Sequence, residues 1–268
     1  MNIVSMSSEY PRDLTPDMQP FNPLELARTT QKLVCSGNKR KYTAIYAVGV
    51  YGGIVTAYAV GCSLRCIYCW VGPGREYPKR YGKFYSPFEV FNVFIKIAKK
   101  RRLRKLRVSG SEPTLCKTHL LELLNLVEDV NDIDLFMLET NGTVLGADEG
   151  FVDALSQNQK VHVRVSLKAG TPEGWSRRCG ATPDSFELPY NALLMLMEKE
   201  VSCHAAAMTD PRIMPQEERI RLLSLLNEIH PDLAKSLEEE RIDPYEATLR
   251  RLKVAGYNVD RWPKLTEE

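Results

Sequence analysis

Apolar and polar positions follow two alternating periodicities through the middle of the chain. Short, mostly apolar runs predict buried strands, and helical spacing of the apolar residues between them predicts amphipathic helices. The predicted strands span residues 106–110, 135–140, 161–167 and 201–208, and the predicted helices span residues 89–100, 119–130, 149–156 and 183–199. Strands that alternate with helices indicate βα units, a parallel sheet and right-handed crossovers.

The two ends of the chain depart from this alternation. The stretch before residue 23 is rich in Pro, Ser and Asp, which predicts a loose extension. A helix is expected over residues 24–34, and two β-prone runs separated by Gly52 and Gly53 predict either a hairpin or one strand following another. Three helices are expected after Pro211, over residues 216–229, 233–241 and 244–255. We therefore predict an N-terminal extension (1–52), a core domain (53–210) and a helical C-terminal cap (211–268).

Composition restricts the class of protein only loosely. The chain has 268 residues, 44% of them hydrophobic and 26% charged, with a formal net charge of +2. This is an ordinary globular composition, and overall charge alone does not predict binding to a polyanion. No apolar run approaches the roughly 18–20 residues that span a bilayer. Residues 1–20 have no apolar core of a secretory signal, so we expect a cytoplasmic protein without membrane contact.

Seven cysteines are present, and three of them stand close together. In a reducing cytosol, clustered cysteines more often bind metal or perform chemistry than form disulfides. The other four, Cys35, Cys116, Cys179 and Cys203, are scattered, and the sequence assigns them no role.

The close cysteines are Cys62, Cys66 and Cys69, in a C-x3-C-x2-C arrangement directly after a predicted strand. Thiolates are the soft ligands that iron–sulfur clusters require, and one loop can wrap a compact cluster. Three local ligands leave one iron of a [4Fe–4S] cluster open to a small molecule. Three alternatives remain: buried small hydrophobes, a zinc site completed by a distant His, and an electron-transfer cluster completed by a distant Cys.

These residues resemble the radical S-adenosylmethionine (SAM) superfamily, whose signature is C-x3-C-x-aromatic-C, with Tyr68 as the aromatic residue. A second motif of that family, usually Gly-Gly-Glu-Pro, is matched at a strand end with Ser in place of the second Gly. The matching residues are Gly110, Ser111, Glu112 and Pro113. Two more strand ends are similar to the glycyl-radical-enzyme activases of the superfamily. They carry Asn141 within Thr-Asn-Gly, and Ser166 and Lys168, where the activases have Asp-x-Lys.

The resemblance covers residues 51–208 and implies an α/β fold, a partial (β/α)6 TIM-like barrel with the cluster at the C-terminal strand ends. It implies two cofactors, a [4Fe–4S] cluster on the three cysteines and SAM on the motif residues named above. It also implies an external one-electron reductant of ferredoxin or flavodoxin type. Reductive cleavage of SAM would yield a 5′-deoxyadenosyl radical that abstracts hydrogen from the substrate. A strand histidine, His204, is interpreted as half-buried rather than catalytic.

Three charged segments bear on the substrate. Residues 70–87 interleave basic and aromatic side chains, which favours a cover over the cluster, with RNA contact as the alternative. The basic run 96–107 is interpreted mainly as a solvated face on the side away from the cluster. The acidic run 237–241 is interpreted as a solvated helix.

The sequence thus predicts a radical SAM oxidoreductase that abstracts hydrogen from an unidentified peptide or small molecule, related to the activases. One alternative is a tRNA-modifying radical SAM enzyme, since Cys69-Trp70 and residues 109–115 look like the wyosine-forming branch. The other is a non-enzymatic iron–sulfur electron carrier. The identity of the substrate does not follow from these residues.

Overall fold

The computed structural model describes residues 10–262, so parts of the predicted N-terminal extension (1–9) and C-terminal cap (263–268) lie outside the described residues. The strands are β1 Cys35–Ser36, β2 Lys39–Val48, β3 Ile54–Ala59, β4 Lys83–Tyr85, β5 Lys105–Gly110, β6 Leu135–Thr140, β7 Val161–Leu167, β8 Cys203–Met208 and β9 Glu238–Glu240. The helices are α1 Pro23–Val34, α2 Pro87–Arg101, α3 Lys117–Glu128, α4 Glu149–Leu155, α5 Pro172–Cys179, α6 Leu188–Glu198, α7 Gln216–Ile229, α8 Pro231–Lys235 and α9 Glu246–Val254.

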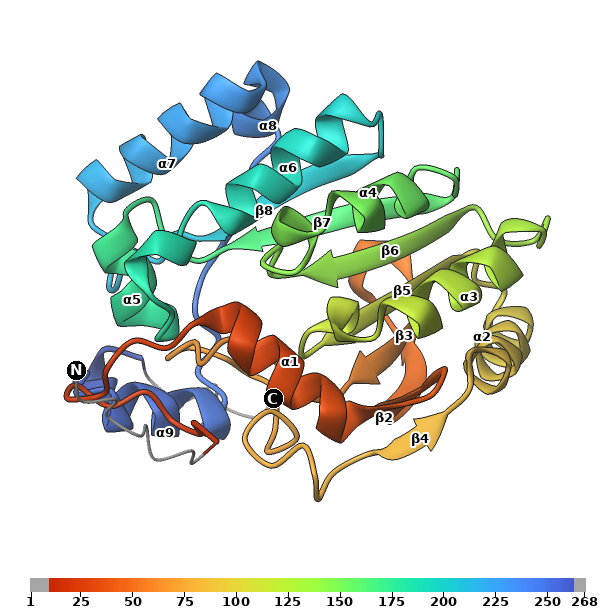
Figure 1. Ribbon diagram of the computed structural model, residues 1–268, viewed down its shortest axis with the longest axis horizontal. Helices are drawn as coiled ribbons and strands as arrows, with labels where there is room; N and C mark the ends of the chain where they lie inside the picture. The colour runs from red at the N-terminus through yellow and green to blue at the C-terminus, as the bar shows by residue number, and fades with distance from the viewer. Residues whose placement is uncertain (1–9, 263–268) are drawn as a thin grey trace, which may run out of the picture.

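One mostly parallel sheet organises these elements. Its hydrogen-bonded path runs β1-β2-β3-β5-β6-β7-β8-β9, and β4 pairs with β2. The strands from β3 through β5 to β9 pair in parallel, whereas β2 and β3 form the antiparallel hairpin expected around Gly52 and Gly53. Helices α3, α4 and α6 lie on one side of the sheet (Figure 1). The fold is therefore the α/β fold with a mostly parallel sheet that the sequence predicts.

Local sequence explains the elements that shape the barrel wall. Helix α2 begins at a capping box formed by Ser86 and Glu89, has Pro87 in its first turn, and ends in a basic turn. Its buried side chains, Val90, Phe94 and Ala98, recur every four residues and pack on the sheet. The parallel strands are buried on both faces, and their central apolar residues have almost no exposed area.

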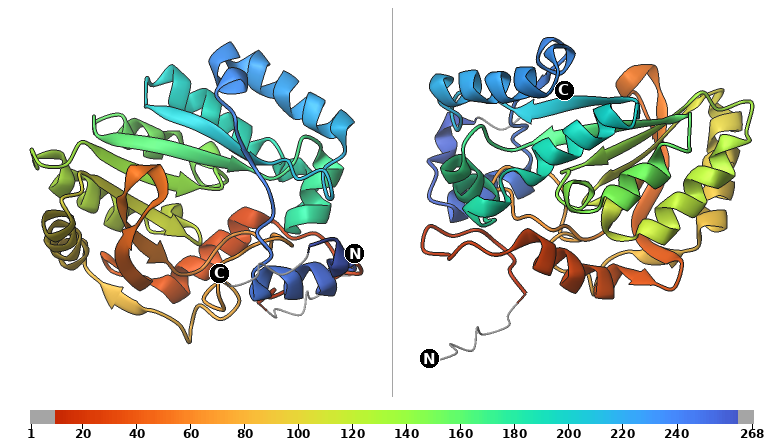
Figure 2. Two further views of the ribbon diagram at one scale, coloured as in Figure 1. Left: turned by 180° about the vertical axis from the view of Figure 1, so that it is seen from behind. Right: turned by 45° about the horizontal axis from the view of Figure 1, so that its top comes forward.

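The expected C-terminal helix over residues 233–241 is wrong. The structure has the short helix α8 there, followed by strand β9, which extends the sheet by pairing in parallel with β8. The view from behind shows the segment after α8 crossing the sheet on the side opposite α3, α4 and α6, and continuing to α9 (Figure 2). The charge pattern of residues 237–241 suggested a solvated helix because acidic residues are depleted from strands, and tertiary pairing overrides that preference.

Candidate active site

The cysteine loop begins where β3 ends. Gly61 has φ +82°, and a Cβ there would lie 2.6 Å from the Thr30 side chain, so only glycine fits between the loop and α1. The loop is then held by two backbone hydrogen bonds to the end of α5, from Arg65 to Cys179 (2.9 Å) and from Ile67 to Arg178 (2.9 Å). Cys62, Cys66 and Cys69 are free thiols, and all three line one cavity of about 710 Å³.

The end of β5 forms the wall beside this loop. Gly110 has φ +97°, and the backbone N–H groups of Ser111 and Glu112 donate to the carbonyls of Ala59 (3.3 Å) and Gly61 (2.9 Å). These bonds join the predicted SAM motif to the end of β3 and to the start of the cysteine loop. Pro113 is buried in the following turn and, unlike its three predecessors, does not line the cavity.

Glu112 has no exposed area, and its carboxylate connects two strand ends. It accepts hydrogen bonds from the Thr114 backbone (3.1 Å) and hydroxyl (2.7 Å), from the Thr140 hydroxyl (2.7 Å) and from the Asn141 backbone (2.8 Å). A buried carboxylate with four donors is fixed in place. Glu112 therefore holds the ends of β5 and β6 in register at the cavity wall.

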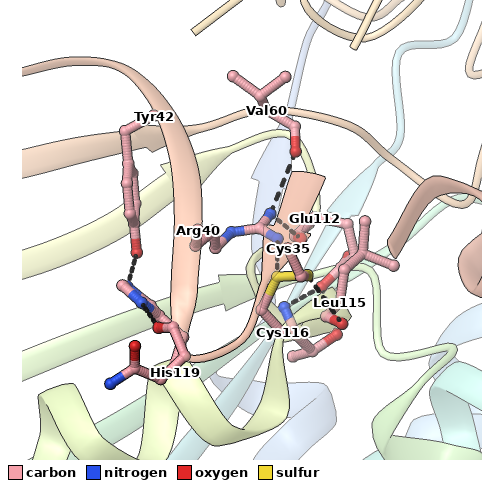
Figure 3. The surroundings of a disulfide bond; sticks show 10 residues. Cys35, Arg40, Tyr42, Val60, Glu112, Leu115, Cys116 and His119 are labelled. Atoms are coloured by element: carbon pink, nitrogen blue, oxygen red, sulfur yellow. Dashed lines mark hydrogen bonds between the residues drawn. A yellow bond between two sulfur atoms is a disulfide. The ribbon is translucent and has the colours of Figure 1, made fainter. Parts of the chain in front are cut away.

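Figure 3 shows what lies behind this wall. The buried guanidinium of Arg40 donates to the carbonyls of Glu112 (2.6 Å) and Val60 (3.3 Å) and to Cys116 Sγ (3.1 Å). Cys116 forms a disulfide with Cys35 across a sequence separation of 81 residues. The sequence assigns these two cysteines no role, and they meet only because folding brings the end of α1 against the start of α3.

The remaining predicted residues lie on neighbouring strand ends. Asn141 donates from Nδ2 to Ser63 Oγ (3.0 Å) in the cysteine loop, and Lys168 donates to Ser166 Oγ (2.5 Å). Asn141, Ser166 and Lys168 all line the cavity, together with Tyr68. The C-terminal ends of parallel strands converge on one side of the sheet, which explains why residues distant in sequence meet here.

A band of paired charges, which the sequence did not predict, lies deeper in the cavity. Arg107 donates to Glu139 (2.9 Å), and Arg164 donates to Glu238 (2.9 Å) and Glu240 (2.8 Å) on β9. Arg107 and Arg164 are buried, so the interpretations of Arg107 within a solvated basic run and of Glu238 and Glu240 on a solvated helix are wrong. The hydrogen bond with His204, followed by those from Arg164, holds the pKa of Glu238 well below its usual range.

His204 is half-buried, as predicted, and belongs to a chain of polar side chains. Its Nε2 lies 3.1 Å from Glu238 Oε2, and its Nδ1 lies 2.6 Å from Nε2 of His162, which in turn contacts Ser202 Oγ (2.7 Å). Burial lowers the pKa of His162 to about 4, with the neighbouring imidazole as the second cause.

Aromatic side chains line another part of the cavity. Tyr46 and Tyr58 stack with ring centroids 4.9 Å apart, and Trp70 packs edge-on against Tyr58 at 6.1 Å. Tyr46 and Trp70 keep 49% and 47% of their surface exposed, so an aromatic surface faces the solvent at the cavity. In the neighbouring segment Tyr81 and Phe84 are also exposed, so its aromatic residues are not uniformly packed inward as a cover would require.

The lining fits an iron–sulfur cluster and SAM. The three thiols come from one loop, and burial raises the pKa of Cys62 to about 12, so metal binding must displace its proton. In residues 10–262 no three His, Cys, Asp or Glu side chains converge closely enough for a single metal ion. Two buried hydroxyls in the cavity wall, of Tyr68 and Ser111, have no hydrogen-bond partner in this part of the chain. Buried polar atoms without partners are rare, so they fit a polar ligand.

The fold is that of a TIM-like barrel enzyme, and the site places three cysteine thiols at the C-terminal ends of the strands. Residues 57–226 match the family model described as Radical SAM superfamily, and the chain belongs to that superfamily. The cofactors of the chain are therefore a [4Fe–4S] cluster and SAM, and members of the superfamily need an external electron donor. Within the described residues, no helix is both long and apolar enough to span a membrane.

The matched curated relatives differ in activity. The chain is 33% identical over 115 residues to a GTP 3′,8-cyclase of Aquifex aeolicus, covering 42% of this chain and 33% of the relative. It is 30% identical over 115 residues to a protein of Methanocaldococcus jannaschii named as a glycyl-radical enzyme activating enzyme, covering 43% and 39%. The matches thus span well under half of each relative.

Among solved structures, Streptococcus suis SuiB bound to the precursor peptide SuiA superposes with a TM-score of 0.56. The two chains are 17% identical, and the match covers 70% of this chain and 38% of the other. At this identity the likeness shows the shared fold.

Proposed function

We propose that this chain binds a [4Fe–4S] cluster through Cys62, Cys66 and Cys69, cleaves SAM, and abstracts hydrogen from a peptide or small molecule. The observation that carries the proposal is that the three free thiols share one cavity with six motif residues from three further strand ends. When bound, the cluster and SAM supply the 5′-deoxyadenosyl radical, and the electron comes from a carrier of ferredoxin or flavodoxin type.

The roles of the protein residues follow from their partners. In residues 10–262 no carboxylate lies within ion-pair distance of Lys168, which donates to the Ser166 hydroxyl, so its charge is available to the SAM carboxylate. The main chain of Gly110 and Ser111 offers polar groups to the SAM amino group. Glu112 acts by holding this wall, because its oxygens are already occupied by protein donors.

The rest of the cavity favours a substrate with an apolar or aromatic part. The charges of Arg107, Glu139 and Arg164 are paired with one another or with β9, whereas Tyr46 and Trp70 are open to solvent. Exposed aromatic side chains beside a pocket are typical of peptide and small-molecule recognition. The similarity to an activating enzyme supports a protein-directed reaction.

The test is anaerobic reconstitution with iron and sulfide, followed by dithionite and SAM, with 5′-deoxyadenosine as the product measured. We expect the wild-type chain and Cys203→Ala, which changes a free thiol outside the loop, to form the product. Cys66→Ala should lose it by at least a hundredfold, because a cluster ligand is missing. A wild-type protein that holds a full cluster and leaves SAM intact would instead be an electron carrier. RNA binding that weakens steeply with salt would favour the tRNA-modifying alternative.

A further inference from the structure

The main chain of the cysteine loop is bound by three buried arginines, one for each cysteine. Arg65 donates to the carbonyl of Cys62 (3.0 Å), Arg75 donates to the carbonyl of Cys66 (2.7 Å), and Arg251 donates to the carbonyl of Cys69. Their exposed fractions are 0%, 1% and 3%, respectively. A guanidinium that is removed from water so completely is unusual on a loop and requires a reason.

The three arginines come from separate parts of the chain. Arg65 lies in the loop itself, Arg75 lies in the segment that follows it, and Arg251 lies on α9, which is near the C-terminal end of the described residues. Figure 1 shows α9 at the lower edge of the molecule, next to the N-terminal segment. That segment contributes as well, since the carbonyls of Pro11 and Arg12 accept from Arg65 and Arg75. Segments near both ends of the described residues therefore converge on the cysteine loop.

Carboxylates compensate only part of this positive charge. One oxygen of the buried Glu76 accepts from both Arg75 (2.7 Å) and Arg251 (2.7 Å), and Asp13 pairs with Arg250 (2.9 Å). Arg65 has no carboxylate partner among residues 10–262; it donates to carbonyls and stacks on the Tyr10 ring at 4.8 Å. A buried charge without a counter-charge is strongly destabilising. An anion bound on the inner side of the cysteine loop would supply the missing counter-charge.

A cluster held by three thiolates would be that anion. The thiolates outweigh the positive charge of an oxidised cluster core, and one-electron reduction adds further negative charge. Nearby buried cations favour the more negative form and raise the reduction potential, since net charge and hydrogen bonding around a cluster set its potential. A low dielectric inside the protein strengthens this effect.

On this basis we propose that Arg65, Arg75 and Arg251 are positioning residues that orient the three cysteines and raise the reduction potential of the bound cluster. The proposal rests on cluster binding by these cysteines, as given under Proposed function. It goes further by assigning a redox role to residues other than the cysteines and the SAM-motif residues, one of them on helix α9. A merely structural contact would hold the loop without changing the potential.

The experiment compares Arg65→Gln and Arg251→Gln with Arg65→Lys and Arg251→Lys after anaerobic reconstitution. Iron and sulfide content reports cluster binding, and an EPR-monitored redox titration with dithionite reports the midpoint potential. The control is Arg104→Gln, which removes one positive charge from an exposed pair with Asp134 at the start of β5. It matches the change in total charge without touching the cysteine loop.

We expect each Gln variant to lower the ratio of reduced to oxidised cluster at a fixed potential by tenfold or more, which is a downward shift of about 59 mV or more. The Lys variants should have a midpoint potential close to that of the wild type, and Arg104→Gln should have the wild-type potential. Loss of iron by the Gln variants, but not by the Lys variants, would also support a requirement for positive charge at these positions. The proposal is wrong if the Gln variants titrate like the wild type, or if Lys and Gln variants lose iron equally. A wild-type protein without a cluster would overturn the proposed function instead.

Discussion

Buried arginines define this site at the scale of single residues. Arg40 lies behind the cavity wall, where it binds the carbonyl before the cysteine loop and the carbonyl of Glu112. Burial lowers the pKa of Arg40, with partial compensation from Tyr42 and Glu112. Its third partner is the sulfur of Cys116, so the Cys35–Cys116 disulfide lies directly against the residue that joins two walls of the cavity (Figure 3).

We expect this disulfide to contribute measurably to stability. It closes a loop of 81 residues, for which the chain-entropy model gives about 4.5 kcal/mol, within an observed range of roughly 2–5 kcal/mol. Anaerobic urea unfolding of the wild type with and without a phosphine reductant should show a loss of this size on reduction. Cys35→Ser should resemble the reduced wild type and should not respond to the phosphine. Equal stability of oxidised and reduced wild type would mean that the two sulfurs are not bonded in solution.

Sequence motifs could predict some of these residues and not others. The cysteines and the Ser-Glu-Pro turn are recognisable because their spacing is tied to a strand end. Arg65 and Arg75 carry no such mark, because a buried arginine and a solvated one look the same in a sequence. The disulfide was missed for a related reason, since Cys35 and Cys116 meet only through the packing of α1 against the turn before α3.

At the scale of elements, strand β9 adds acidic side chains to both faces of the sheet. The strand has three successive glutamates, and its alternate side chains point to opposite faces of the sheet. Glu238 and Glu240 reach Arg164 inside the barrel, whereas Glu239 reaches Arg219 outside. The other helices and strands were predictable from periodicity to within a few residues, apart from α5, α8, β1 and β4. No periodicity marks a three-residue strand of like charges.

This arrangement predicts that two ion pairs on one strand differ in strength. The Arg164 side chain is 6% exposed, against 30% for Arg219, although both bind a glutamate through two nitrogens. A double-mutant cycle of Arg164→Gln with Glu238→Gln should give a coupling energy of about 1–3 kcal/mol in urea unfolding. The cycle of Arg219→Gln with Glu239→Gln should give about 1 kcal/mol or less. Equal coupling in both cycles would show that burial of Arg164 does not strengthen its pair.

At the scale of the whole molecule, the segments that flank the barrel within residues 10–262 pack against the core fold. Asp13 and Arg250 pair across the two ends, and α1 lies against the turn that follows the SAM motif. The predicted division at residue 52 and residue 211 stays a prediction, but contacts cross both boundaries. Sequence reasoning treats such flanking segments as appendages because their contacts are entirely non-local. Stability should therefore depend on groups in the N-terminal hairpin as well as in the barrel.

His119 provides the corresponding test, since it joins α3 to strand β2. It is 1% exposed, its Nδ1 donates to the Asn38 carbonyl (2.7 Å), and its Nε2 accepts from the Tyr42 hydroxyl (2.8 Å), so it is held neutral. Burial lowers its pKa to about 4 from the ordinary value of 6.5, despite the opposing effect of the Asn38 bond, and the Arg40 charge lowers it further. Between these values the unfolded chain binds a proton that the folded chain does not, so stability falls as the pH falls through this window.

The slope attributable to His119 is at most about 1.4 kcal/mol per pH unit. His119→Gln can keep both hydrogen bonds without titrating, so its unfolding free energy should depend less steeply on pH, by close to that amount. Urea unfolding of the reconstituted protein at about pH 5 and pH 7 measures the difference, with His230→Gln, at a half-buried histidine, as the control. Parallel pH profiles for the wild type and His119→Gln would mean that α3 opens to admit the proton while the barrel stays folded. In that case the contact between α3 and the N-terminal hairpin is not part of the cooperative unit.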